Sequence, residues 1–244
     1  MNANSISRRA RYRLRNLVSH VPAIYLPLAD MKKVDKDGAT IVTRKTELVM
    51  DAFPRSGSTF AVTAFRLHNA DVDLAHHFHA PAQLIRGARL GKPVLLIVRQ
   101  PKDAVCSLAL REPHLSLELG LKSWINFHRR LLPYTTNLVV ASFERITTDF
   151  GLAIDEVNRK FGTSFARFEH TEENVQTCFR LIEKRSAMRF GGGVVLEEGV
   201  ARPSGVRQVQ KVSLQEKWQS LPQRLRDEAA DMYAKWKAFE SSHP

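Results

Sequence analysis

Residues Glu47–Phe60 read ELVMDAFPRSGSTF and contain an apolar run, a polar turn and the start of an apolar periodic segment. The run, residues 48–53, has Asp51 as its one polar member and ends at Pro54. From Phe60 onward, apolar side chains recur at three- and four-residue spacing. This order predicts a buried strand, a tight turn and a helix, and a turn at a helix N-terminus directs backbone N–H groups toward one point. We expect an anion site there; an ordinary strand–helix connection with a capping serine is the alternative.

The turn differs from a Walker A phosphate loop, which has Gly, four residues, then Gly-Lys-Ser/Thr. Ala52 stands in the place of the first glycine, and Ser58 stands in the place of the lysine. The cation is Arg55 instead, two residues before Gly57. These differences weaken an ATP-hydrolysing interpretation and leave a phosphate-binding one.

A second strand–turn–helix pattern lies in Lys92–Leu110, KPVLLIVRQPKDAVCSLAL. Val94–Val98 is an unbroken apolar run, typical of a strand buried on both faces of a parallel sheet. Arg99 follows at the carboxyl end of this run, and Pro101 suits the first position of a helix. Ser107 then lies eight residues after Arg99, inside the predicted helix.

Two parallel strands that end in polar turns place both turns at the same edge of the sheet, where open α/β sheets bind ligands. We therefore expect Arg55, Thr59, Arg99 and Ser107 to converge on one multiply charged ligand. The alternative is an arginine that ends a strand and a serine without a role in its helix.

Three histidines, His76, His77 and His79, lie in the segment 71–80. If this segment were extended, His77 and His79 would point to one face. Two imidazoles make an incomplete zinc site, and no Cys, Asp or Glu stands nearby at a recognisable ligand spacing. The sequence therefore predicts no metal; it favours a general base or an anion contact, and a histidine-rich surface loop is the alternative.

The composition bounds the class of protein. A chain of 244 residues with 43% hydrophobic content can bury one sizeable core. A net charge of +12 and a pI near 10.0 favour anionic partners such as a nucleotide, an acidic glycan, a lipid surface or nucleic acid. Cys106 and Cys178 form neither a disulfide framework nor a metal-ligand pair, and no apolar stretch reaches transmembrane length. We expect a cytoplasmic location.

We divide the chain into a basic N-terminal arm, 1–46, and a single α/β domain, 47–244, with 191–213 as a mobile loop. Five arginines crowd residues 8–15, and apolar residues follow up to Leu26. A basic amphipathic segment over 8–26 is suited to peripheral contact with an anionic membrane. A solvated basic tail packed on the domain is the other interpretation.

The two phosphate motifs together resemble those of the PAPS-dependent sulfotransferase family. Pro54–Phe60 resembles the family's 5′-phosphosulfate loop, usually PKSGTTW, and residues 98–107 resemble its 3′-phosphate motif with Arg and Ser at the same separation. His79-Ala80-Pro81 resembles the His-x-Pro that carries the catalytic base, and residues 143–145 resemble a Tyr-Glu-Asp element. The likeness covers residues 47–161.

The resemblance implies a three-layer α/β/α fold with a central parallel sheet, similar to P-loop nucleoside-triphosphate hydrolases. It implies PAPS as donor, PAP as product and no metal. His79 would be the general base, His77 stands where many members have Lys, and Arg55 would stabilise charge on the departing oxygen. The residues expected to bind the cofactor are Arg55, Ser56, Gly57, Ser58, Thr59, Phe60, Arg99, Ser107, Phe143, Thr177, Phe179 and Arg202.

Several positions depart from the family pattern. Arg55 replaces a lysine, which exchanges a point charge for a flat fork. Phe60 replaces the tryptophan that stacks on adenine, and Phe143 lacks the tyrosine hydroxyl. The C-terminal Arg-Lys-Gly signature is not present as such, and Arg202 in Arg202–Gly205 is its nearest counterpart.

The expected activity is transfer of a sulfuryl group from PAPS to an acceptor hydroxyl or amine. The basic surface and the N-terminal arm favour a glycan or glycolipid acceptor. A nucleotide or small-metabolite kinase is an alternative, but it should have a Walker lysine and a Mg²⁺-binding carboxylate. An inactive sulfotransferase-like binding protein is another. No nucleic-acid partner is expected, because the arginines cluster at the terminus rather than on a basic face with aromatic residues.

Overall fold

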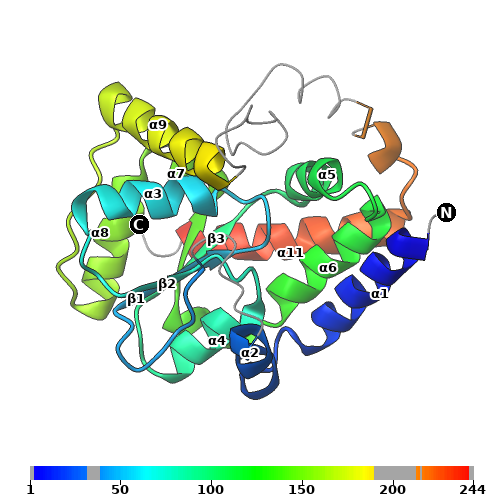
Figure 1. Ribbon diagram of the computed structural model, residues 1–244, viewed down its shortest axis with the longest axis horizontal. Coiled ribbons are helices and arrows are strands. Elements are labelled where there is room, and N and C mark those ends of the chain that lie inside the picture. Colours follow the sequence, from blue (N-terminus) through cyan, green and yellow to red (C-terminus); the bar gives the residue numbers. More distant parts are fainter. Residues whose placement is uncertain (1–2, 32–38, 190–212, 215, 242–244) are drawn as a thin grey trace.

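A parallel β-sheet between two layers of helices forms the centre of the protein (Figure 1). The computed structural model describes residues 3–31, 39–189, 213–214 and 216–241. In these ranges the sheet has four strands, all parallel, in the order β2-β1-β3-β4. The predicted α/β fold, with helices on both faces of a parallel sheet, is confirmed. The strands are β1 (Leu48–Ala52), β2 (Leu74–His76), β3 (Val94–Val98) and β4 (Val139–Ser142).

The strands are apolar because both faces of the sheet are covered. Along β3, Val94, Leu96 and Val98 enter one hydrophobic core, and Leu95 and Ile97 enter the other. Successive side chains of a strand point to opposite faces, so a strand buried on both sides has almost no place for a polar residue. Among the described strand residues the exceptions are Asp51 in β1, which is fully buried, and His76 and Ser142 at the ends of β2 and β4.

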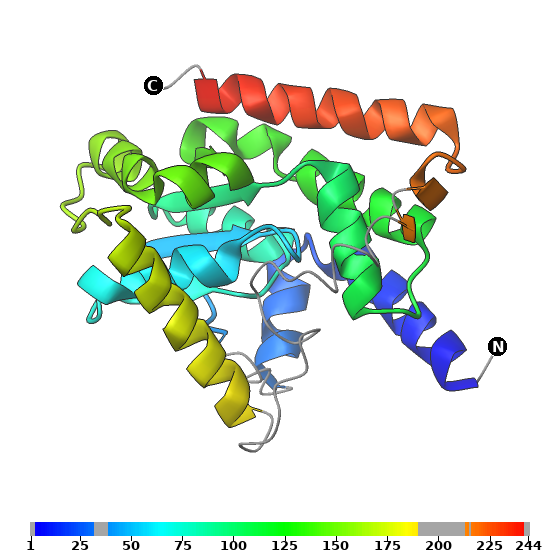
Figure 2. The same ribbon diagram turned by 90° about the horizontal axis from the view of Figure 1, so that it is seen from above.

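Two groups of helices supply the two layers, and Figure 2 shows α11 and α9 on opposite sides of the sheet. The first layer contains α2 (Pro22–Met31), α4 (Pro81–Arg89), α5 (Pro101–Arg111), α6 (Leu117–Arg129) and α11 (Gln223–Ser241). The second contains α3 (Ser58–His68), α8 (Phe150–Phe161) and α9 (Glu172–Arg189). The structure also has α1 (Ala3–Val18), η1 (Leu132–Asn137) and α7 (Phe143–Thr148).

The strand order creates a switch point between β1 and β3. The chain passes from β1 through α3 to β2 on one side, and then returns through α4 to β3 on the other side of β1. The turns that follow β1 and β3 therefore lie side by side at one edge of the sheet, and they lead to helices on opposite faces, α3 and α5. In open α/β sheets this is where ligands bind.

The strands and helices that carry strong apolar patterns form where the sequence predicts them. β3 is Val94–Val98 as predicted, and α5 begins at Pro101. The extended backbone assumed for His77 and His79 is wrong, because these residues have φ of 61° and 50°. β2 ends at His76, and the next residues turn back toward β1. The predicted loop, 191–213, lies almost wholly outside the described residues.

The N-terminal helices α1 and α2 are fastened to the rest of the molecule by hydrogen bonds. Arg15 donates through Nη2 to the carbonyl oxygen of Phe78 (2.9 Å) and through Nε to the Tyr25 hydroxyl (2.9 Å). Asn16 donates to the Ser123 hydroxyl at 2.6 Å, so α1 lies against α6 (Figure 1).

The outer face of α1 is different. Leu14 and Leu17 are 62% and 69% exposed. Contact of residues 8–26 with an anionic membrane stays a prediction. In the described part of the chain, no helix is both long and apolar enough to cross a bilayer.

One buried histidine makes stability depend on pH. His128 in α6 is fully buried and donates through Nδ1 to the Trp124 carbonyl (2.8 Å). Burial lowers its pKa to about 3, although the hydrogen bond to Trp124 opposes this. Between about pH 6.5 and the folded pKa, the unfolded chain binds a proton here that the folded chain does not, so stability falls as pH falls, by about 1.4 kcal/mol per pH unit.

We therefore expect the unfolding free energy of His128→Leu to fall less steeply with decreasing pH than that of the parent, by about 1.4 kcal/mol per pH unit. Denaturant unfolding at pH 6.5, 5.5 and 4.5 measures it. Equal slopes in the variant and the parent would contradict the prediction.

Candidate active site

The turn after β1 can exist only with glycine at its centre. Gly57 precedes α3 and has φ of 91°. A Cβ placed on Gly57 would lie 3.0 Å from the ring of Phe143, the first residue of α7, which follows β4 directly. The aromatic ring therefore packs directly on the backbone of this turn, and the N-terminus of α3 faces the same edge of the sheet.

The two cationic turns at the switch point contact each other. Arg99 donates from Nη1 to the carbonyl oxygen of Arg55 at 2.8 Å, and Arg55 donates from Nε to the Ser107 hydroxyl at 3.1 Å. The guanidinium of Arg99 lies over the Phe143 ring, 4.0 Å from its centroid. Burial lowers the pKa of Arg99, and Asp103 and Glu144 oppose this effect. The structure thus brings together residues that the sequence assigns to two separate phosphate sites.

Two polar atoms of this edge are buried without a partner. Among the described residues, Ser56 Oγ and Arg99 Nε are enclosed and have no hydrogen-bond acceptor or donor near them. Buried polar groups in proteins are nearly always hydrogen-bonded, so each exception calls for an explanation. Acceptor oxygens of a bound anion would satisfy both atoms, and the residues present therefore fit a phosphorylated ligand.

A buried carboxylate, Asp51, organises the histidine segment. It accepts hydrogen bonds from the backbone N–H groups of Ala52 (2.8 Å), Phe78 (3.1 Å) and His79 (3.0 and 3.1 Å). Its nearer oxygen also lies 3.4 Å from His79 Nδ1. In the sequence, Asp51 is the one polar residue of an apolar run. That feature alone does not indicate a role for it, and the role follows only from these contacts.

The tautomer of His79 follows from its hydrogen bond. Nδ1 lies 2.9 Å from the carbonyl oxygen of Ala52. A carbonyl oxygen only accepts, so Nδ1 carries the proton and Nε2 has a free lone pair. The His79 side chain is 25% exposed, whereas Asp51 is fully enclosed. This arrangement can take up a proton at Nε2 while Nδ1 stays fixed.

Backbone strain is concentrated at the same edge. Arg55, His77 and His79 are the non-glycine residues with positive φ in the described chain, at 68°, 61° and 50°. Each such conformation costs about 1–3 kcal/mol and persists only where surrounding contacts fix it. Such outliers cluster at functional sites, and these three are the residues predicted to be catalytic.

His77 is more enclosed than His79. Its Nδ1 lies 2.6 Å from Nδ1 of His76, and its Nε2 lies 3.4 Å from the Thr59 hydroxyl. Burial, followed by the neighbouring His79 and His76, lowers the pKa of His77 well below its usual value. Within the described ranges, no group of three or more His, Cys, Asp or Glu side chains is placed to hold a metal ion.

The predicted adenine-binding residues are only partly assembled. The Phe60 and Phe179 rings lie 5.8 Å apart, and Phe60 is also 5.8 Å from His170. The hydroxyl of Thr177 donates to the Glu173 carbonyl within α9. Arg202 lies outside the described residues.

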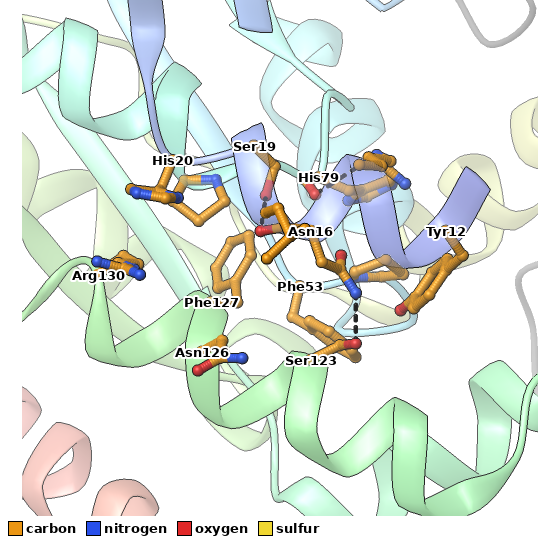
Figure 3. A pocket seen from close by; sticks show the side chains of 14 residues that line it. Tyr12, Asn16, Ser19, His20, Phe53, His79, Ser123, Asn126, Phe127 and Arg130 are labelled. Carbon is orange, nitrogen blue, oxygen red and sulfur yellow. Dashed lines mark hydrogen bonds between the residues drawn. The ribbon is translucent and has the colours of Figure 1, made fainter. Parts of the chain in front are cut away.

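A pocket of about 100 Å³ opens beside His79 (Figure 3). Pro54 and His79 line it on the side of the phosphate turn, and α1 and α6 supply much of the remaining wall. The contribution of α1 is not apparent from the sequence, where arginines dominate the segment. The α1 residues concerned include Tyr12, Arg15 and Asn16.

Comparison with known proteins gives likenesses in structure but not in sequence. No family model matches the chain, and no curated protein matches its sequence. Among solved structures, the chain is similar to mouse sulfotransferase SULT7A1 complexed with PAP, with a TM-score of 0.44 and 12% identity, over 87% of this chain and 95% of that one. A likeness at this level does not decide the activity, which has to be argued from the site itself.

Asp51→Asn tests the role of the carboxylate in positioning His79. The amide keeps the shape but presents an N–H group toward backbone N–H groups, so we expect a loss of about 1.5–3 kcal/mol in unfolding free energy. Denaturant unfolding measures this effect. Unchanged stability would show that the buried carboxylate does not hold this segment.

Proposed function

We propose that this chain is a PAPS-dependent sulfotransferase, which moves a sulfuryl group from PAPS to an acceptor hydroxyl or amine. One observation carries the proposal: the turns of Arg55 and Arg99 contact each other at the switch point, and the nearby His79, whose Nδ1 is held by the Ala52 carbonyl, lines a pocket. A ligand with phosphates at both ends and a second substrate in the pocket would meet at this point.

The binding groups divide between the two ends of the nucleotide. The N–H groups at the start of α3, with Arg55 and the hydroxyls of Ser58 and Thr59, would hold the 5′ end. Arg99 and Ser107 would hold the 3′-phosphate. The hydrogen bond of 3.1 Å between Arg55 and Ser107 shows that both groups reach the same space. On binding of the nucleotide, each of these two side chains would exchange that bond for one to its own phosphate.

When bound, PAPS supplies the sulfuryl group: the acceptor oxygen forms a new S–O bond as the S–O bond to the 5′-phosphate breaks, and the electron pair leaves with PAP. His79 would take the acceptor proton at Nε2, and the Asp51 carboxylate would stabilise the resulting imidazolium from 3.4 Å. Arg55 and the N–H groups of the turn would stabilise charge on the leaving oxygen. Loss of one preorganised donor of this kind costs about 3 kcal/mol of transition-state stabilisation.

The site argues against a kinase. A kinase needs a carboxylate at the end of a strand to hold Mg²⁺. Asp51 ends β1, but its oxygens accept from three backbone N–H groups and face away from solvent. The turn also has no lysine at the Walker position.

Arg99→Ala tests the 3′-phosphate site. Removal of a charge-assisted hydrogen bond should weaken PAP binding by about ten- to a hundredfold. AMP lacks the 3′-phosphate and serves as the control ligand, because its affinity should change little in this variant. Calorimetric titration measures both. Equal losses for PAP and AMP would show that Arg99 does not contact the 3′ end.

His79→Asn tests the base. The Asn side chain retains an N–H donor for the Ala52 carbonyl but has no basic nitrogen, so turnover should fall by about 10²–10⁴ while PAP affinity stays constant. Transfer of label from ³⁵S-PAPS to acceptors in a cell extract measures turnover. His77→Asn is the matched control, and we expect it to retain activity within a few-fold. If His77→Asn lost activity and His79→Asn retained it, the base would be His77.

A further inference from the structure

We propose that the pocket beside His79 binds the acceptor, and that the acceptor is a small hydroxyl compound that also carries an oxyanion, either a carboxylate or a phosphate. The inference rests on the proposed function for the role of His79. It adds the chemical class of the acceptor and assigns its recognition to α1 and to the end of α6.

The size and lining of the pocket suit a compound of one ring. An apolar cavity of about 150 Å³ takes up benzene. The pocket, at about 100 Å³, is smaller but has an open side, so a compound of one ring would lie partly in the opening. Phe53 and Phe127 meet edge to face, with centroids 5.8 Å apart, and form an aromatic surface. Asn126, near this surface, and the hydrogen-bonded pair Asn16 and Ser123 add polar groups.

The fixed charges in the pocket lining are positive. Arg15 and Arg130 line the pocket, together with His20, whose lowered pKa favours the neutral imidazole, and the lining contains no Asp or Glu. Arg15 is already engaged with backbone carbonyls of the histidine segment. Arg130, by contrast, has no ion pair with a carboxylate in the described part of the chain. Arg130 is exposed, and an anionic ligand in the pocket would give its guanidinium a charged partner.

The cationic end and the basic imidazole are at different places in the pocket. Figure 3 shows His20 and Arg130 together at one end, with Phe127 and Phe53 between them and His79. Proximity of Arg130 adds to burial in lowering the pKa of His20, which agrees with this placement. A ring on the aromatic surface would therefore direct an oxyanion toward Arg130 and a hydroxyl toward His79.

Arg129 provides a matched control for Arg130. The two residues are adjacent at the end of α6, but Arg129 pairs with Glu228 of α11 and does not line the pocket. Arg129→Gln removes the same charge from nearly the same place. Arg130→Lys keeps the charge at the pocket and should retain part of the effect.

The experiment measures binding of 4-hydroxybenzoate, 4-hydroxyphenyl phosphate and the neutral isostere 4-hydroxybenzamide to the protein saturated with PAP, in a buffer without phosphate or sulfate. We expect at least one anionic compound to bind about five- to tenfold tighter than the amide, the range of a partly exposed charge-assisted contact. The preference should disappear in Arg130→Gln and remain in Arg129→Gln. Comparison of the two anions identifies the oxyanion.

Equal affinity for the anions and the amide, an unchanged preference in Arg130→Gln, or no binding of any of the three would overturn the inference. The outcome for the proposed function is separate. One outcome is that PAP fails to bind while the preference for an anion is lost in Arg130→Gln and kept in Arg99→Ala. In that case the sulfotransferase proposal fails and the anion pocket stands. If PAP binds and label is transferred without any preference for acids, only the pocket assignment fails.

Discussion

The enclosed Asp51 carboxylate is the constraint on which the site depends. A charge buried at the end of a central strand is tolerated only if hydrogen bonds satisfy it. Asp51 obtains them from the backbone of Ala52 in its own strand and from Phe78 and His79 after the neighbouring strand. The same contacts hold His79 in a left-handed conformation and bring its Nδ1 to the Ala52 carbonyl. The position and the tautomer of the imidazole therefore have one origin.

The cationic side of the site depends on topology in the same way. Because β3 lies next to β1 on the side opposite β2, the turns of Arg55 and Arg99 meet although 44 residues separate them. Phe143, the first residue of α7 directly after β4, then covers both the glycine of the first turn and the guanidinium of the second. Three strand ends thus make one surface. The strained backbone at Arg55 is stabilised by the hydrogen bonds of its carbonyl oxygen with Arg99 and of its side chain with Ser107.

The sequence predicts those strands and helices that form because of the residues within them. The apolar run at Val94–Val98 and the proline at position 101 define β3 and the start of α5 without further information. The conformation at His77 and His79 could not be predicted in this way, because it depends on a carboxylate 26 to 28 residues earlier in the chain. The wall made by α1 depends on contacts of Asn16 and Arg15 across 107 and 63 residues. The arginines of this segment indicated charge, but nothing in their spacing indicated which of them faces inward.

The placement of α1 has an evolutionary consequence. The turns after β1 and β3 join strands that pack in both cores, whereas Tyr12 and Asn16 belong to α1, a helix attached at the surface of the domain. Substitutions in this helix can reshape one wall of the pocket while the strand ends keep their geometry. Under the proposed function, a lineage of such proteins can diversify in its acceptors by drift in its first twenty residues and retain a common donor.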